Sequence, residues 1–118
     1  MIRRYEERNI EVKKMFDGDG QVQLAHILNG AGEMYGKGRV FSVATLKPGC
    51  EIGWHIHHGD GETYCIVSGH GEYNDNGTIV PVGPGDVTFC DDGEGHSLKN
   101  TGTEDLVSVA LILYNTNT

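Results

Sequence analysis

Turn-forming residues divide this sequence into short segments. Eighteen of its 118 residues are glycine, and they are spread along the chain instead of forming one glycine-rich tract. This is about twice the usual share of roughly 7%. Runs of β-branched and aromatic residues lie between the glycines, and Asn76-Gly77 separates two such runs with a strong hairpin signal. The pattern predicts many short strands joined by tight turns.

The expected strands follow one another at a spacing of roughly ten residues. Residues 1–8 are expected to form a short helix or an extended arm. The strands are expected at residues 12–16, 21–28, 40–46, 52–57, 63–68, 71–74, 78–82, 86–90, 96–100 and 106–114. Ten short strands with almost no helix indicate an all-β antiparallel sandwich or closed barrel. We expect one domain, with an arm and first strand in residues 1–20 and a single barrel in residues 21–118.

Charge and cysteine content exclude several classes of protein. Nine Lys and Arg against seventeen Asp and Glu give a net charge of −8, which argues against nucleic acid or an anionic membrane as a partner. No glycine-rich nucleotide-binding motif stands between a strand and a helix. The three cysteines form no CxxC pair, so we expect reduced thiols. The first residues lack the apolar core of a secretory signal, which makes a cytoplasmic location the expectation.

Three histidines and a glutamate have a spacing that suits a metal site. His55 and His57 are two residues apart on an expected strand, so both imidazoles point to the same face. Glu62 opens the next strand, and an antiparallel neighbour would bring its carboxylate back beside them. His96 begins a later strand. Three imidazoles and one carboxylate form a mixed set of ligands that suits Mn, Fe, Co, Ni or Zn.

The glycines around these residues complete two long motifs. Residues 49–69 read G(x)5HxH(x)4E(x)6G, and residues 85–100 read G(x)5DxGxxHxxxN. In this respect the sequence resembles the cupin superfamily, whose first motif is matched at every fixed position. The second motif is matched except that Asp91 stands where proline is usual. The resemblance extends over about residues 40–113 and is closest to the small single-domain cupins.

The resemblance implies a fold and a ligand set. The fold is a conical antiparallel β-barrel, also described as a double-stranded β-helix or jelly roll. One divalent transition metal ion per chain is expected near its mouth, with His55, His57, Glu62 and His96 as ligands. Octahedral coordination by four protein ligands leaves two positions for water or a small molecule, whereas structural zinc sites are usually closed.

Two functions follow as alternatives. The first is a small metalloenzyme whose substrate is a compact chelating molecule, such as an oxo-acid, dicarboxylate, diketone or sugar derivative. Lyase or decarboxylase, isomerase and dioxygenase activities all occur in the superfamily, so the fold does not choose among them. The second is a non-catalytic protein that binds a small ligand through the metal ion or serves as an auxiliary protein.

Further side chains are candidates for contact with the ligand. His26 shares a strand face with apolar residues, and Tyr64 shares the side of Glu62, so both are expected to point inward as catalytic groups or as packed core residues. Lys37 and Arg39 could neutralise an anionic substrate if their loop folds over the mouth. Trp54 is expected to face outward and to contribute to a homodimer interface.

Overall fold

The computed structural model describes residues 1–116, and ten strands account for most of that part of the chain. No α-helix occurs among these residues, and none of their helical turns is long or apolar enough to span a membrane. In chain order the elements are η1 (Tyr5–Glu7), β1 (Ile10–Lys13), β2 (Val22–Leu28), η2 (Ala31–Met34), β3 (Gly38–Leu46), β4 (Glu51–Ile56), β5 (Asp60–Ser68), β6 (Gly71–Asp75), β7 (Thr78–Val82), β8 (Val87–Cys90), β9 (Gly95–Asn100) and β10 (Leu106–Tyr114).

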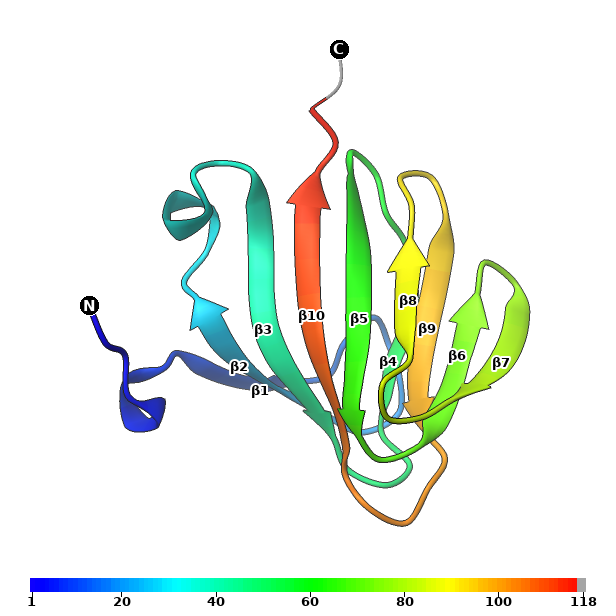
Figure 1. Ribbon diagram of the computed structural model, residues 1–118. Coiled ribbons are helices and arrows are strands. Elements are labelled where there is room, and N and C mark those ends of the chain that lie inside the picture. The colour runs from blue at the N-terminus through cyan, green and yellow to red at the C-terminus, as the bar shows by residue number, and fades with distance from the viewer. Residues whose placement is uncertain (117–118) are drawn as a thin grey trace.

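The strands form two antiparallel sheets. The larger sheet has the order β1-β2-β3-β10-β5-β8, and the smaller has the order β4-β9-β6-β7. In Figure 1 the larger sheet faces the viewer, with β10 between β3 and β5, and the smaller sheet lies behind and to the right. This arrangement confirms the expected all-β jelly-roll architecture.

Alternation of side chains along each strand directs one face of each sheet inward. On β5, Glu62, Tyr64 and Ile66 are buried while Cys65 and Val67 are exposed. The same alternation on the other strands builds one apolar core. Its most deeply buried members are Val22, Ala44, Leu46, Tyr64, Ile66, Leu98 and Leu106.

The first expected strand is displaced. Residues 12–16 were expected to be extended, but β1 ends at Lys13, and Phe16 and Asp17 have φ angles of 53° and 57°. The turn therefore begins within the residues that were expected to be extended. It is fixed by the carbonyl of Met15, which accepts hydrogen bonds from the backbone N–H groups of Gly18 and Gly53, both at 3.0 Å.

Asn100 connects the second motif to two loops. Its buried amide nitrogen donates to the carbonyls of Leu46 at 2.8 Å and Glu104 at 2.7 Å, and its amide oxygen accepts from the backbone of Gly102 at 2.9 Å. Each polar atom of the side chain is therefore paired, as buried amides require. The end of β9 is held to the loop that leads into β10.

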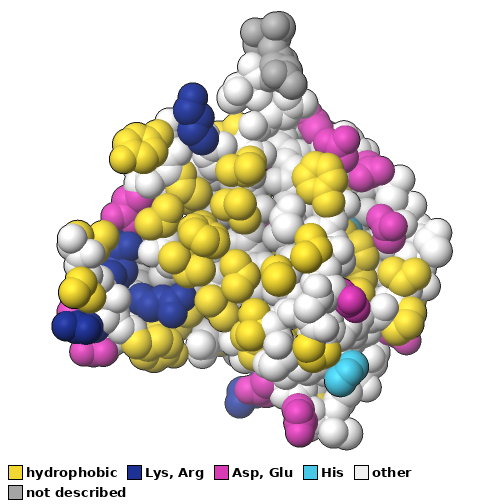
Figure 2. All heavy atoms as spheres, viewed as in Figure 1, with side chains coloured by type: hydrophobic (Ala, Val, Ile, Leu, Met, Phe, Trp, Pro, Cys, Tyr) yellow, Lys and Arg dark blue, Asp and Glu magenta, His cyan; other side chains and the backbone are white. Residues whose placement is uncertain are grey.

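An apolar surface covers the outer face of the larger sheet. Figure 2 shows hydrophobic side chains gathered on the face over β10, β5 and β8. Four of them are highly exposed: Val67, Val87, Phe89 and Leu113. We call these four residues the outer apolar patch.

Candidate metal centre

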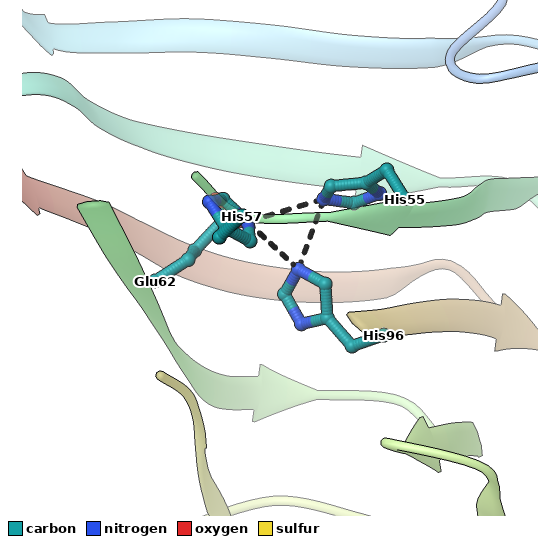
Figure 3. Close-up of side chains that lie close together, drawn as sticks. All are labelled: His55, His57, Glu62 and His96. Carbon is teal, nitrogen blue, oxygen red and sulfur yellow. Dashed lines mark hydrogen bonds and ion pairs between the residues drawn. The ribbon is translucent and has the colours of Figure 1, made fainter. Parts of the chain in front are cut away.

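Four side chains meet between the two sheets. His55 lies on β4, His57 follows directly after β4, Glu62 lies on β5 and His96 on β9, and Figure 3 shows them pointing toward one another. One ligand atom from each lies within 4.8 Å of all the others. The Nε2 atom of His96 is 3.0 Å from Nε2 of His55 and 3.1 Å from Nε2 of His57.

The strand pairing that builds this cluster differs from the expected one. We expected Glu62 to lie on a strand paired with that of His55 and His57. Instead β4 pairs with β9, where His55 stands directly opposite His96, and β5 pairs with β10 and β8 in the other sheet. Beyond the end of β4, the backbone of His57 still bonds to Gly93 and Glu94. The carboxylate therefore reaches the histidines across the space between the sheets.

Each imidazole is held from behind through Nδ1. The partner of Nδ1 is the carbonyl of Gly53 for His55 at 2.8 Å, Asp60 Oδ1 for His57 at 2.6 Å and the hydroxyl of Tyr73 for His96 at 2.9 Å. Carbonyl and carboxylate oxygens only accept hydrogen bonds, so Nδ1 is the protonated nitrogen of His55 and His57. In the neutral rings Nε2 then presents a lone pair to the centre of the cluster.

The carboxylate of Glu62 favours positive charge at this centre. Burial opposes its ionisation, but the imidazoles of His55, His57 and His96, whose Nε2 atoms lie 3.1–3.7 Å from Oε1 of Glu62, outweigh burial and lower the pKa of Glu62. Hydrogen bonding to Glu62 raises the pKa of His57, whereas burial lowers the pKa of His96. The centre thus combines an ionised carboxylate with imidazole lone pairs that face one another at short range.

This donor set fits a divalent transition metal ion. Lone pairs on Nε2 atoms 3.0–3.1 Å apart repel one another unless a cation or a proton lies between them. Imidazole nitrogens that donate from their other ring nitrogen to a carboxylate or carbonyl are typical of metal ligands in proteins. The four residues expected to bind metal are therefore brought together with the orientation that a metal would need.

The structure adds two supporting residues that the sequence did not single out. Asp60 accepts from His57 and also from Arg39, whose Nε lies 2.8 Å from Asp60 Oδ2. Burial opposes ionisation of Asp60, but hydrogen bonds from Arg39 and His57 outweigh it and lower the pKa of this carboxyl group. Tyr73 supports His96. Asp60 stands between two predicted ligands in the sequence, which was a usable signal, whereas Tyr73 reaches the site only through the pairing of β6 with β9.

Lys37 and Arg39, which were expected to share a loop, differ in position, since Lys37 precedes β3 and Arg39 lies on it. Arg39 lines the cavity beside the cluster, whereas Lys37 is exposed and is not among the residues that line it. The positive charge of Arg39 is paired with Asp60, the carboxylate that accepts a hydrogen bond from His57.

His26 lines the same cavity as the cluster but has both ring nitrogens engaged. Its Nε2 lies 2.7 Å from Glu11 Oε2, and its Nδ1 lies 2.6 Å from the hydroxyl of Ser42. Because a carboxylate only accepts, Nε2 donates to Glu11, and in the neutral ring Nδ1 accepts from Ser42. The inward orientation predicted for His26 is present, and its protons are shared with neighbouring protein groups.

Tyr64 also lies inside, next to the cluster. It is 1% exposed, and its ring stacks on that of His96 with centroids 5.0 Å apart. Burial, together with the nearby carboxylate of Glu62, raises the pKa of Tyr64 well above the usual value. Its phenol therefore remains protonated at neutral pH and can serve as a hydrogen-bond donor.

The cluster opens into a cavity of about 170 Å³. For comparison, an apolar cavity of about 150 Å³ holds a benzene molecule. His55, His57 and Glu62 lie at one end of its lining, which also includes Tyr64 and His26. The space suits a small molecule.

Known proteins share this fold and these motifs. A family model described as "Cupin domain" matches residues 42–112. A protein of Thermotoga maritima named oxalate-binding protein is 43% identical over 102 residues, which cover 86% of this chain and 84% of the relative. The crystal structure of a predicted oxalate decarboxylase from Thermotoga maritima has a TM-score of 0.90 and 42% identity, covering 97% of this chain and 99% of that one.

A more distant solved structure shows the fold alone. The cupin domain of Schizosaccharomyces pombe Cnp3 has a TM-score of 0.71 at 19% identity, covering 80% of this chain and 62% of that chain. Together with the family model and the relative that is 43% identical, these likenesses agree with the two motifs and the jelly-roll architecture. The chain belongs to the cupin family.

Proposed function

We propose that this protein binds one divalent transition metal ion per chain and uses it to bind a compact acid with two adjacent oxygen donors. The metal ligands in this proposal are His55, His57, Glu62 and His96. Its main support is the convergence of three Nε2 atoms on a buried carboxylate, with each ring held at Nδ1. Bound there, the ion would supply Lewis acidity to an oxygen ligand.

The relatives support an acid as the ligand. One is named for binding oxalate, and the similar solved structure is described as a predicted oxalate decarboxylase. Oxalate has two adjacent carboxylates and is small enough for a cavity of about 170 Å³. We therefore use oxalate as the first probe of this site.

A metalloenzyme is the second candidate, and Tyr64 is the observation that favours it. Its protonated phenol is buried in the cavity beside Glu62, where it could donate a hydrogen bond to a bound substrate oxygen. The reaction of such an enzyme would be that of a lyase or decarboxylase, an isomerase or a dioxygenase. Binding without turnover is the better supported proposal because both nitrogens of His26, the other inward candidate, are engaged by Glu11 and Ser42.

The test begins with metal content. Untagged protein is purified and its metal is measured by mass spectrometry, alongside Glu62→Gln, His57→Ala and His58→Ala. His58 is exposed in the loop next to His57 and lies outside the cluster, so it is the matched control. We expect Glu62→Gln and His57→Ala to lose most of the metal and His58→Ala to keep it. Equal metal content in all four proteins would refute the assignment.

Ligand binding is tested on the metal-loaded protein. Oxalate at a hundred times its dissociation constant should stabilise the fold by about 2.7 kcal/mol, which is readily seen in thermal unfolding. Recovering the oxalate unchanged after incubation supports binding, whereas its conversion to formate and carbon dioxide supports the enzyme.

A further inference from the structure

The cavity has a floor that runs from the cluster to His26. Register between the strands places Tyr64 of β5 opposite Ala110 of β10, Ala110 opposite Ser42 of β3, and Ser42 opposite His26 of β2. Three strand spacings separate the ends of this row, about 14 Å along the sheet. Both middle residues are small, and of the two Ala110 lines the cavity. The cavity therefore follows this row as a trough, with the cluster at one end and His26 at the other.

The wall of the trough is largely aliphatic. Its lining includes Leu24, Val40, Ala44, Ile52, Ala110 and Ile112. All of these except Val40 are buried, with at most 7% of their surface exposed. An oxygen of a ligand that pointed at this wall would lose its hydrogen bonds to water without replacement, which is costly. A hydrocarbon group there would instead be stabilised by burial.

The basic groups that line the cavity already have acidic partners. Among the described residues of the lining, Lys13 and Arg39 supply the Lys and Arg side chains. Arg39 lies beside the cluster, where its Nε is paired with Asp60 at 2.8 Å. Lys13 lies 3.9 Å from Glu11, which also accepts from His26. A second carboxylate on the ligand would meet Glu11 as well as Lys13 at the His26 end, so the structure does not favour a dicarboxylate that spans the trough.

We infer that the preferred ligand is a 2-oxo acid with a short branched aliphatic tail, bound with its adjacent carbonyl and carboxylate oxygens at the cluster and its tail over Ala110. This inference rests on the proposed function, because the head group is held by the same metal site. Oxalate would occupy only the cluster end and leave the trough unfilled. The 2-oxo acid retains two adjacent oxygen donors and places carbon against the aliphatic wall.

A ligand series tests the inference on the wild-type protein. Protein loaded with Mn²⁺ is titrated by calorimetry with oxalate, pyruvate, 2-oxobutanoate, 3-methyl-2-oxobutanoate and 2-oxoglutarate. Each buried methylene is expected to tighten binding about fourfold. Affinity should therefore rise from pyruvate to 3-methyl-2-oxobutanoate. It should be lower for 2-oxoglutarate, whose tail ends in a carboxylate.

Replacement of alanines by valine tests the position of the tail. Ala110→Val adds carbon to the floor and Ala44→Val adds carbon to the wall. Ala25→Val is the matched control, since Ala25 is as buried as Ala110 and does not line the cavity. We expect Ala110→Val to weaken binding of 3-methyl-2-oxobutanoate at least tenfold and binding of oxalate less than twofold. Ala25→Val should bind both as the wild type does.

The outcomes separate the inference from the proposed function. If oxalate binds and affinity is flat or falls as the tail grows, the inference is overturned and the proposed function stands. If Mn²⁺-loaded protein binds neither oxalate nor any oxo acid, the proposed function itself is overturned. The ligand series uses the wild-type protein alone, so it can refute the inference even if a valine variant is unstable.

Discussion

Asp60 links the guanidinium group of Arg39 to the cluster. Its carboxylate accepts from His57 Nδ1 at 2.6 Å and from Arg39 Nε at 2.8 Å. An ionised acceptor behind an imidazole fixes its orientation and makes it a stronger metal ligand. Arg39 holds this acceptor in place and keeps it ionised.

Substitution of Asp60 by asparagine should weaken the metal site without removing a ligand. The amide oxygen can still accept from His57, but the negative charge and the ion pair with Arg39 are lost. Loss of such a supporting group commonly lowers metal affinity by about 10–100-fold. Competition with a fluorescent chelator measures the change. Asp105→Asn is the control, because Asp105 is an exposed residue of a different loop and lies outside the cluster. An unchanged affinity in Asp60→Asn would deny Asp60 this role.

Cys65 and Cys90 differ in their surroundings, and we expect them to differ in reactivity. Burial, reinforced by the carboxylates of Glu94 and Glu62, raises the pKa of Cys90 to about 12. A raised pKa means that at pH 8 the thiol is almost entirely protonated, and only the thiolate reacts with alkylating agents. Cys65 is exposed on the opposite face of the same sheet.

We therefore expect iodoacetamide at pH 8 to label Cys65 quickly and to leave Cys90 unlabelled in the folded protein. Peptide mass spectrometry over a time course distinguishes the two sites. Labelling in denaturant should remove the difference. Labelling of Cys90 at the rate of Cys65 in the folded protein would show that its surroundings are more open than in this structure.

At the scale of elements, the turn after β1 is fastened to the strand that carries His55. Met15 accepts from Gly18 and Gly53, and the ring of Phe16 stacks on the ring of His55 with centroids 3.9 Å apart. A Cβ atom on Gly53 would lie within 3.0 Å of the backbone of Phe16 and Gly18. Only glycine lets these two segments approach so closely.

Gly53→Ala should push this turn away from β4 and destabilise the fold by about 1–3 kcal/mol, as overpacking against backbone does. Urea unfolding of the metal-free protein measures the change. Gly32→Ala is the control, because nothing lies within 4 Å of a Cβ atom built there and no positive φ is needed. Equal stability of the two variants would contradict the close approach.

The sequence predicted the strands well and their pairing less well. Alternation and turn signals depend on neighbouring residues, so the expected strands at residues 78–82 and 106–114 agree with β7 and β10. Pairing depends on contacts between distant segments. The short loop between His57 and Glu62 resembled a hairpin, yet the chain crosses there from one sheet to the other.

The same limit applies to the site. The four cluster residues were identified from their spacing, which the motifs preserve. Tyr73 and Ser42 had no such signal, because each reaches its histidine only through strand register. Trp54 is exposed on β4, as expected, but β4 belongs to the smaller sheet whereas the outer apolar patch lies on the larger one. The contribution of Trp54 to a homodimer interface stays a prediction.

At the scale of the whole molecule, the outer apolar patch is the feature that predicts self-association. Contiguous exposed apolar surface on a folded protein usually marks an interaction site. Val67, Val87, Phe89 and Leu113 are 49–65% exposed on adjoining strands. We expect a homodimer in which this patch meets its equivalent in a second copy.

Phe89→Glu should shift the protein to the monomer, because a charge would be buried without a partner in the dimer. Sedimentation velocity at several concentrations measures the shift. Ile79→Glu is the control, since Ile79 is 62% exposed on β7 in the other sheet. A wild-type protein that sediments as a monomer, or a Phe89→Glu variant that remains dimeric, would remove the patch from the interface.

The residues that line the cavity fall into separate stretches of the chain. The metal ligands of the proposal lie between residues 55 and 96, whereas Glu11, Leu24, His26, Arg39 and Val40 all precede residue 42. Ala110 and Ile112 complete the aliphatic wall from β10. Substitutions outside residues 55–96 can therefore change the choice of guest molecule while the side chains that hold the ion stay the same.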